Sequence, residues 1–184
     1  QQTVTKGNFP IGVFITHTQS GDSSGDASTR ASQFSQLSVS INLYRALNPT
    51  HPIIVMGDFN ASDSSAEYTS NMLSSLGNIA HTGDVAVNRT VNSDGTQCTT
   101  CANNVIRQAF GGSGNSRIDY ILYGYSADGH VRLIPKRYDV RTPRAANAIS
   151  GAGWDPESFS DFTLTTTLLS DHEAIYAEFD LVRE

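Results

Sequence analysis

Five consecutive apolar residues, Pro52 to Met56, constrain the fold of this chain more than any other stretch of its sequence. Because successive side chains of a strand point to opposite faces, a strand formed here is apolar on both faces and must be covered on both. Amphipathic helical patterns lie on either side of it, over Thr29–Leu47 and after a capping box formed by Ser64 and Glu67. The sequence therefore predicts a central strand of a sheet within a layered α/β domain.

Four other segments have the composition of strands. They are Ile11–Thr16, Arg117–Tyr123, Val131–Val140 and Glu173–Val182. The last of them alternates strictly between two sets of side chains, which is typical of a strand with one covered face. The strands mix with helices along the chain and no internal repeat interrupts them, so we expect residues 1–184 to form part of one domain.

Composition limits the class of protein without fixing its function. The chain has 184 residues, of which 38% are hydrophobic and 16% charged, as in globular domains. No stretch of about 18 apolar residues occurs, so no transmembrane segment is predicted. The formal net charge of -6 argues against a dedicated nucleic-acid binder, which usually presents a basic face. It still allows a nuclease, because a bound divalent metal can supply local positive charge.

Two cysteines, Cys98 and Cys101, form a single Cys-x-x-Cys motif. One such motif without a second pair makes a poor zinc site. A local disulfide or two unreactive thiols in a loop are the remaining interpretations. A disulfide would indicate an exported protein, so a secreted or extracytoplasmic location is the expectation that goes with it.

Polar, titratable residues follow or begin several of the predicted strands. Taken singly, each has a plain structural explanation, such as a hydrogen-bonded histidine or a tight turn. Strand ends at one edge of a sheet are also where side chains from distant parts of a chain meet around a ligand. The segments in question are Thr16–Gln19, Gly57–Asn60, Arg117–Tyr120 and Ser170–His172.

In this order, the GDFN, RIDYIL and SDH motifs resemble the second half of the exonuclease–endonuclease–phosphatase superfamily. The resemblance implies the C-terminal half of a four-layered, deoxyribonuclease-I-like α/β sandwich with a mixed, largely antiparallel sheet and flanking helices. It covers about Gly12 to Phe179. Further details are similar to the bacterial neutral sphingomyelinase C branch: Thr16-His17-x-Gln19 with Arg30, Ser65-x-Glu67-Tyr68, and Asp139-Val140-Arg141-Thr142-Pro143.

The resemblance also implies chemical roles for the polar strand-end residues. His172 would be the general base, with Asp171 beside it either orienting the site or contacting a metal. Asp58 would position water or a metal, and Asn60 would donate its amide to a phosphate oxygen.

His17 would contact the phosphate or protonate the leaving oxygen, and Asp119 would fix the tautomer of that histidine. Two of these residues, His17 and Asn60, are therefore the predicted substrate contacts. The predicted catalytic residues are His17, Asp58, Asn60, Asp119 and His172.

A divalent cation is part of the implied chemistry, with Mg²⁺ expected first and Mn²⁺ or Co²⁺ as substitutes. In this superfamily the main metal-binding Glu and an early Asn lie in the first half of the fold, and no strand ending in such a Glu precedes Ile11. We therefore expect an N-terminal half outside these residues, as in a fragment or a processed subunit, and no activity without it. The predicted metal ligands in this half are Asp58, Asn60, Asp171 and His172.

The implied function is metal-dependent hydrolysis of a phosphodiester, with a lipid headgroup as substrate and sphingomyelin cleaved to ceramide and phosphocholine. A secreted deoxyribonuclease-like endonuclease is the alternative among enzymes, and the negative net charge makes it the less favoured one. An inactive half-domain that serves as a binding module is the alternative from another class. The stretch Gly124–His130 lacks the Trp or Phe with which sphingomyelinase C enzymes dock on lipid.

Overall fold

In the computed structural model the described residues are 2–6, 9–77, 83–84, 98–102, 104–109, 111–141 and 170–184. Residues 142–143 of one predicted motif therefore lie outside them. Among the described residues, no helix is both long and apolar enough to cross a membrane.

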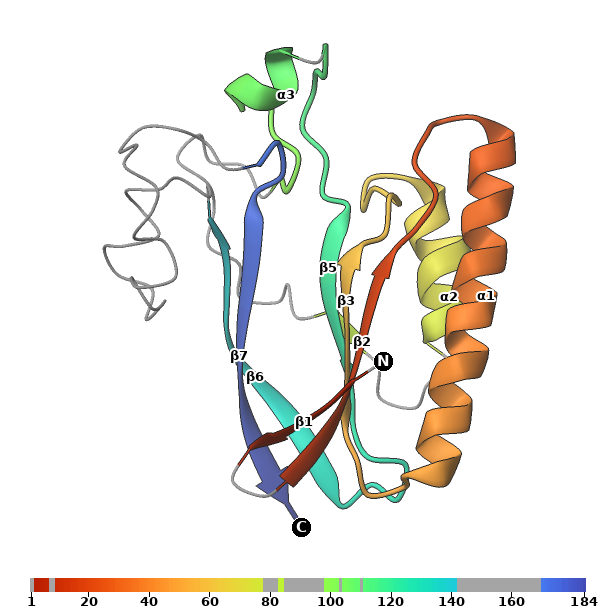
Figure 1. The fold of residues 1–184 in the computed structure, drawn as a ribbon, viewed down its shortest axis with the longest axis vertical. Helices are drawn as coiled ribbons and strands as arrows, with labels where there is room; N and C mark the ends of the chain where they lie inside the picture. The colour runs from red at the N-terminus through yellow and green to blue at the C-terminus, as the bar shows by residue number, and fades with distance from the viewer. Residues whose placement is uncertain are drawn as a thin grey trace.

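Two β-sheets form the centre of the molecule (Figure 1). The order of the five-stranded sheet is β1-β2-β3-β5-β4. Its β2 and β3 are parallel, and its other pairs are antiparallel. The second sheet is an antiparallel pair of β6 and β7. The bounds are β1 Gln2–Lys6, β2 Phe9–His17, β3 Ile53–Asp58, β4 Gly83–Asp84, β5 Asp119–Gly124, β6 Val131–Arg141 and β7 Ala174–Arg183. The mixed, largely antiparallel arrangement is the one predicted.

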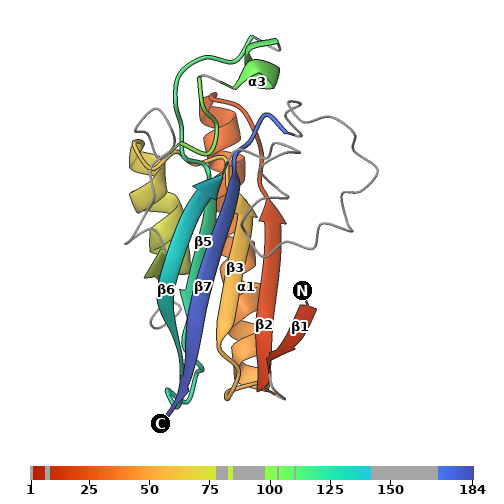
Figure 2. The same ribbon diagram turned by 90° about the vertical axis from the view of Figure 1, so that its left-hand side faces the viewer.

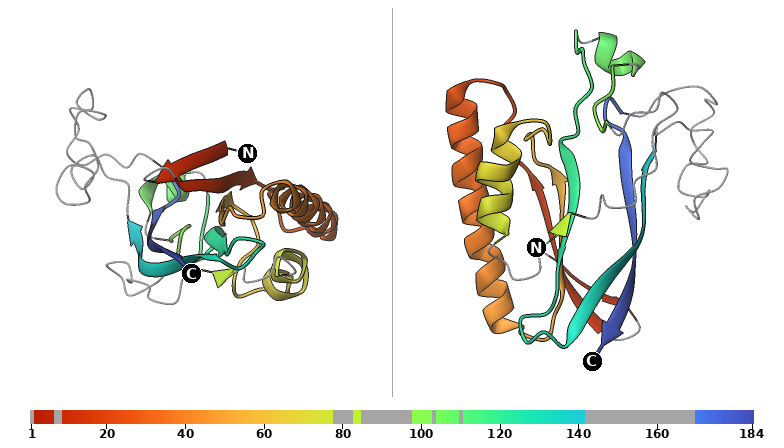
Figure 3. Two further views of the ribbon diagram at one scale, coloured as in Figure 1. Left: turned by 90° about the horizontal axis from the view of Figure 1, so that it is seen from below. Right: turned by 180° about the vertical axis from the view of Figure 1, so that it is seen from behind.

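The strand β3 is central and is covered on both faces, which confirms the prediction from its unbroken apolar run. Ile53 and Val55 point into a cluster beneath the helices, whereas Ile54 and Met56 pack toward the second sheet. Helices therefore cover one face of the five-stranded sheet and β6–β7 covers the other, as the view along the strands shows (Figure 3).

Three helical elements cover one face of the larger sheet: α1 (Ser24–Leu47), the π-helical turn η1 (Tyr68–Leu73) and α2 (Ser74–Leu76). They enclose a core whose largest fully buried side chains include Phe34, Phe59 and Tyr120. A fourth, short helix, α3 (Val105–Ala109), lies beyond the end of the sheet (Figure 1).

The long helix α1 begins earlier than its apolar pattern predicted. Its N-cap is Ser23, whose side chain accepts a hydrogen bond from the backbone of Asp26 while the Asp26 carboxylate accepts one from the backbone of Ser23. This reciprocal box satisfies free backbone N–H groups, so the polar turn before Thr29 becomes helical.

The second predicted capping box, between Ser64 and Glu67, is wrong. The Glu67 carboxylate instead binds the guanidinium of Arg30, with Nε–Oε1 and Nη2–Oε2 distances of 2.6 and 2.8 Å. The Arg30 side chain is only 4% exposed. A buried guanidinium needs a carboxylate partner more than an exposed helix end needs a side-chain cap, because a helix end can bond to water.

The strands are oriented so that their polar ends meet at one edge. Strands β2 and β3 end, and β5 and β7 begin, at the same end of the molecule (Figure 2). This edge carries the strand-end residues that the sequence singled out, and α3 lies next to it (Figure 1).

Candidate active site

Three polar residues lie side by side across the edge of the larger sheet. His17 at the end of β2 is in register with Asp58 at the end of β3, and Asp58 is in register with Asp119 at the start of β5. Neighbouring strands are about 4.8 Å apart, so the three side chains are within reach of common partners. The predicted convergence of these strand ends is confirmed.

The Gly-Asp-Phe-Asn segment is both a tight turn and a support for the Asp58 carboxylate. Gly57 has φ 140°, and a Cβ at this position would clash with the carbonyl oxygen of Thr16 on β2. Asn60 adopts φ 48° and its backbone N–H donates to Asp58 Oδ1 at 2.8 Å. The turn thus fixes one carboxylate oxygen and leaves the other, Oδ2, facing the neighbouring histidines.

The amide of Asn60 is partly used within the protein. Its Nδ2 donates to the carbonyl of Thr18 at 2.9 Å, which ties the turn to the segment after β2. Because an amide nitrogen carries two hydrogens, a second N–H is left for another acceptor. Its contact with a phosphate oxygen stays a prediction.

His172 and Asp119 form the closest titratable pair of the site. The distance from His172 Nδ1 to Asp119 Oδ2 is 2.9 Å, and His172 Nε2 lies 4.0 Å from Asp58 Oδ2. The hydrogen bond that the ring donates to Asp119 raises the pKa of His172, and the negative charges around the ring act in the same direction, against the effect of partial burial. With Nδ1 donating to the carboxylate, the neutral ring presents the lone pair of Nε2 to the site.

The predicted pairing of Asp119 with His17 is wrong. Strand β3 lies between the strands that carry these two residues, and the carboxylate of Asp119 is bonded to His172. His17 instead lies against Asp58, with 3.5 Å between His17 Nε2 and Asp58 Oδ2. Its side chain is 73% exposed, so this imidazole is open to solvent or to a ligand.

Asp58 is a partly buried acid close to another acid. Burial, and more weakly the charge of Asp119, raise its pKa, while the hydrogen bond from Asn60 and the two histidines oppose the rise. Two carboxylates in this environment repel each other and gain from a positive charge placed between them.

A divalent cation fits this group. Ligand atoms of Asp58, Asp119 and His172 all lie within 4.8 Å of one another. Two of the four predicted ligands, Asp58 and His172, belong to the group, and Asp119 was not predicted as a ligand. Asp171 is exposed and is outside the group, and the role of Asn60 as a ligand stays a prediction.

The segment after His17 is fixed by the buried Arg30 guanidinium. Besides binding Glu67, Arg30 Nη1 donates to the carbonyls of Gln19 and Gly21 at 2.9 and 2.7 Å. Sequence reasoning placed both Arg30 and Glu67 in recognisable patterns but did not pair them. The only signal in the sequence for this pair is that both residues are charged, with opposite signs, and lie in the two predicted helical segments.

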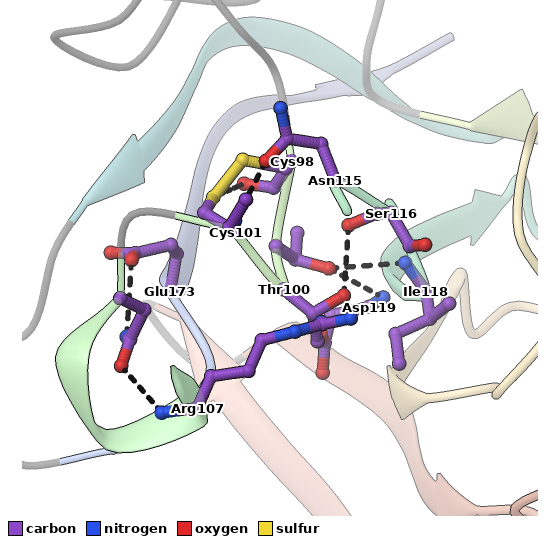
Figure 4. Close-up of a disulfide and its surroundings, with 12 residues drawn as sticks. Cys98, Thr100, Cys101, Arg107, Asn115, Ser116, Ile118, Asp119 and Glu173 are labelled. Atoms are coloured by element: carbon purple, nitrogen blue, oxygen red, sulfur yellow. Dashed lines mark hydrogen bonds between the residues drawn. A yellow bond between two sulfur atoms is a disulfide. The ribbon is translucent and has the colours of Figure 1, made fainter. Parts of the chain in front are cut away.

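The two cysteines form a disulfide behind the site, which supports the first of the two interpretations of this motif (Figure 4). The loop that they close contacts the start of β5, where Asp119 lies. Both cysteines are buried.

Comparison with known proteins gives one family and a set of similar folds. The sequence profile described as the Endonuclease/Exonuclease/phosphatase family matches residues 4–172. No curated protein sequence matches the chain.

Solved structures with a similar fold include two bacterial proteins and one from a nematode. A Staphylococcus aureus beta toxin variant with bound magnesium ions has a TM-score of 0.62 and 22% identity, over 95% of this chain and 55% of its own. Sphingomyelinase C from Streptomyces griseocarneus has a TM-score of 0.61 and 22% identity, over 95% of this chain and 55% of its own. A truncated TDP2 from Caenorhabditis elegans has a TM-score of 0.58 and 16% identity, over 96% of this chain and 57% of its own. The chain thus spans little more than half the length of these relatives.

Proposed function

Because the chain belongs to the endonuclease/exonuclease/phosphatase family, we propose that it forms the C-terminal half of a metal-dependent phosphodiester hydrolase. The observation that carries the proposal is the hydrogen-bonded Asp119–His172 pair, whose free ring nitrogen faces Asp58 at the edge of the sheet. A base oriented by a carboxylate is what activation of a water molecule requires.

The chain's own residues divide the reaction between the two sides of Asp58. On one side, His172 Nε2 takes a proton from the attacking water, and Asp119 stabilises the imidazolium that results. On the other side, His17 contacts a phosphate oxygen or protonates the leaving oxygen in this proposal, and the support for this role is that its ring is exposed beside Asp58. Asn60 holds Asp58 in place and keeps one N–H for a phosphate oxygen.

Asp58 and Asp119 are the residues that would hold Mg²⁺, Mn²⁺ or Co²⁺, while His172, the third member of the group, keeps the lone pair of Nε2 for the proton of the attacking water. When bound, such an ion neutralises charge that develops on the phosphate oxygens. Two carboxylates are too few oxygen ligands for tight binding of Mg²⁺, which prefers six. We therefore propose that the full site needs further ligands from an N-terminal half and that these residues alone are inactive.

For the substrate we propose a lipid phosphodiester, with sphingomyelin as the first choice. Support comes from the sphingomyelinase C among the similar folds and from the motifs that follow its branch. The formal charge of -6 favours a lipid headgroup over a polyanion such as DNA. An endonuclease is the second candidate, because the family description includes that activity. For either substrate, we propose a secreted or extracytoplasmic location.

The test compares three substrates with and without EDTA: sphingomyelin in mixed micelles, plasmid DNA, and a chromogenic phosphodiester. The chain is assayed alone and together with an N-terminal half of the same fold, and His172→Ala is the matched control. We expect metal-dependent release of phosphocholine only when both halves are present. If only DNA is cleaved, the protein is an endonuclease. If no substrate is turned over, the remaining alternative is an inactive half-domain that serves as a binding module. Full turnover by the chain alone would overturn the proposed division of the metal site.

A further inference from the structure

Thr99 occupies the middle of the loop that the Cys98–Cys101 disulfide closes. It is fully buried, although it is polar and lies in a loop. The loop lies near the start of β5 and near Glu173, both of which are drawn around the disulfide in Figure 4. A buried polar residue needs hydrogen-bond partners, and the partners of Thr99 are informative.

The hydroxyl of Thr99 binds the backbone that carries Asp119. Its Oγ1 accepts hydrogen bonds from the N–H groups of Ile118 and Asp119, at 3.0 and 3.1 Å. These two amides lie at the start of strand β5, where Asp119 is its first residue, so the hydroxyl takes the place of a strand partner there. The contact fixes the backbone from which the Asp119 carboxylate projects.

The backbone of the same residue binds the segment that carries His172. The carbonyl of Thr99 accepts a hydrogen bond from the N–H of Glu173, the residue directly after His172, at 2.6 Å. Asn104, also buried, supports this segment as well, since its Nδ2 donates to the carbonyl of Ser170 at 3.1 Å. The turn that carries His172 is thereby held against the disulfide loop.

Thr99 therefore bonds to the backbone of Asp119 and to that of Glu173, the residue next to His172, although Asp119 and His172 are 53 residues apart in sequence. Resting on the proposed function, we propose that Thr99 is a positioning residue, which sets the distance and orientation of Asp119 and His172 by bonding to both backbones. The disulfide keeps it in place, because its two cysteines flank the Thr99–Thr100 dipeptide. Thr99 contacts no reacting atom and acts only through the pair.

The neighbouring Thr100 offers a matched comparison within the same loop. It is also buried, and its hydroxyl bonds to the carbonyl of Ser116 at 3.2 Å. That bond reaches neither the Asp119 amide nor the Glu173 amide. Thr99→Val and Thr100→Val remove the same hydroxyl from adjacent positions and create the same shape.

The first measurement uses the metal-free chain and needs no activity. The ¹⁵N shifts of the His172 ring, at a pH where it is neutral, report which nitrogen carries the proton. We expect the Nδ1–H tautomer in the unmodified chain, a mixture of tautomers in Thr99→Val, and the original tautomer in Thr99→Ser and Thr100→Val. An unchanged tautomer in folded Thr99→Val would overturn the proposal.

The second measurement is turnover of the complete two-half enzyme on the chromogenic phosphodiester. We expect Thr99→Val to lower kcat by roughly tenfold to a hundredfold with little change in KM, since small displacements of a catalytic group cost about that much. Thr99→Ser keeps a hydroxyl and should retain most of the original kcat. Thr100→Val should leave kcat near that of the unmodified enzyme. Equal losses in both valine variants would reduce Thr99 to a structural residue.

Two controls keep the outcomes separate. If no form of the enzyme hydrolyses a phosphodiester, the proposed function fails while the tautomer measurement still decides the role of Thr99. If Thr99→Val does not fold, hydrogen exchange in the unmodified chain decides instead. Slow exchange of the Ile118, Asp119 and Glu173 amides supports the proposal, and fast exchange of all three contradicts it.

Discussion

The two sides of the candidate site are built differently. On the β2 side, the His17 ring is largely exposed and 3.5 Å from Asp58, and a buried ion pair fixes only the segment that follows it. On the β5 side, His172 is 29% exposed, bonded to Asp119 at 2.9 Å, and supported by a disulfide loop. The His172 ring is thus oriented before any ligand arrives, whereas the His17 ring is free to adjust to one. A general base benefits from such preorganisation, which favours His172 for that role.

The most direct way to break this comparison is to remove each imidazole. In the complete enzyme, His172→Ala should lower kcat by about a hundredfold to ten-thousandfold, the usual loss for a general base. His17→Ala should cost less and should raise KM as well, because an exposed contact binds substrate in both ground and transition states. His130→Ala, an exposed histidine far from this edge in the chain's fold, is the control for surface effects. A larger loss at His17 than at His172 would reverse the assignment of the two sides.

A second test removes the support of the β2 side. Glu67→Gln leaves the charge of Arg30 buried without its carboxylate, so the free energy of unfolding should fall by about 3 kcal/mol. Asp180→Asn breaks the exposed pair with Lys136 and should cost under about 1 kcal/mol. Urea titrations measure both. Amide exchange should increase near Gln19 and remain unchanged at Asp119, and an increase at both would mean that the two sides share one support.

A third test sharpens the comparison through coupling between residues. Asp119→Asn should lower kcat, by less than His172→Ala does, since an amide cannot stabilise the imidazolium. Its effect should be non-additive with His172→Ala and additive with His17→Ala. Kinetics of the two double variants against their single variants measure the coupling. Non-additivity with His17 alone would restore the pairing that the sequence first predicted.

The smallest expected effect is a dependence of the free energy of unfolding on pH, which comes from His172 on the β5 side. Asp119 raises the pKa of His172 in the folded chain above its unfolded value near 6.5. The folded state therefore binds the proton more strongly. The resulting stabilisation is complete below pH 6.5 and is lost as the pH rises through the folded pKa. Urea midpoints of the metal-free chain at pH 6 to 9 should fall, and Asp119→Asn should flatten this part of the profile.

Much of this fold could be predicted from local patterns. The unbroken apolar run of β3 required cover on both faces, and the structure supplies helices on one and β6–β7 on the other. The polar strand ends were expected to meet, and His17, Asp58 and Asp119 do so in register.

The partners of these residues could not be predicted in the same way. Whether Asp119 bonds to His17 or His172 depends on the strand order, which places β3 between β2 and β5, and on the turn before β7. The sequence offered Glu67 a nearby partner, the helix end that it was predicted to cap. Glu67 binds the distant Arg30 instead, because the buried guanidinium needs a carboxylate. Thr99 lies inside the Cys-x-x-Cys motif but had no predicted role of its own, because its importance comes only from two backbones that the fold brings together.

Gly57 shows how such a site would look in a mutational scan. Any side chain there would push β3 away from Thr16 of β2, directly beside the register pair of His17 and Asp58. Every substitution should therefore abolish activity as completely as the loss of a reacting group. A map of tolerated substitutions would mark Gly57 as catalytic, although it offers no atom to the chemistry, and only a structure separates the two kinds of intolerance.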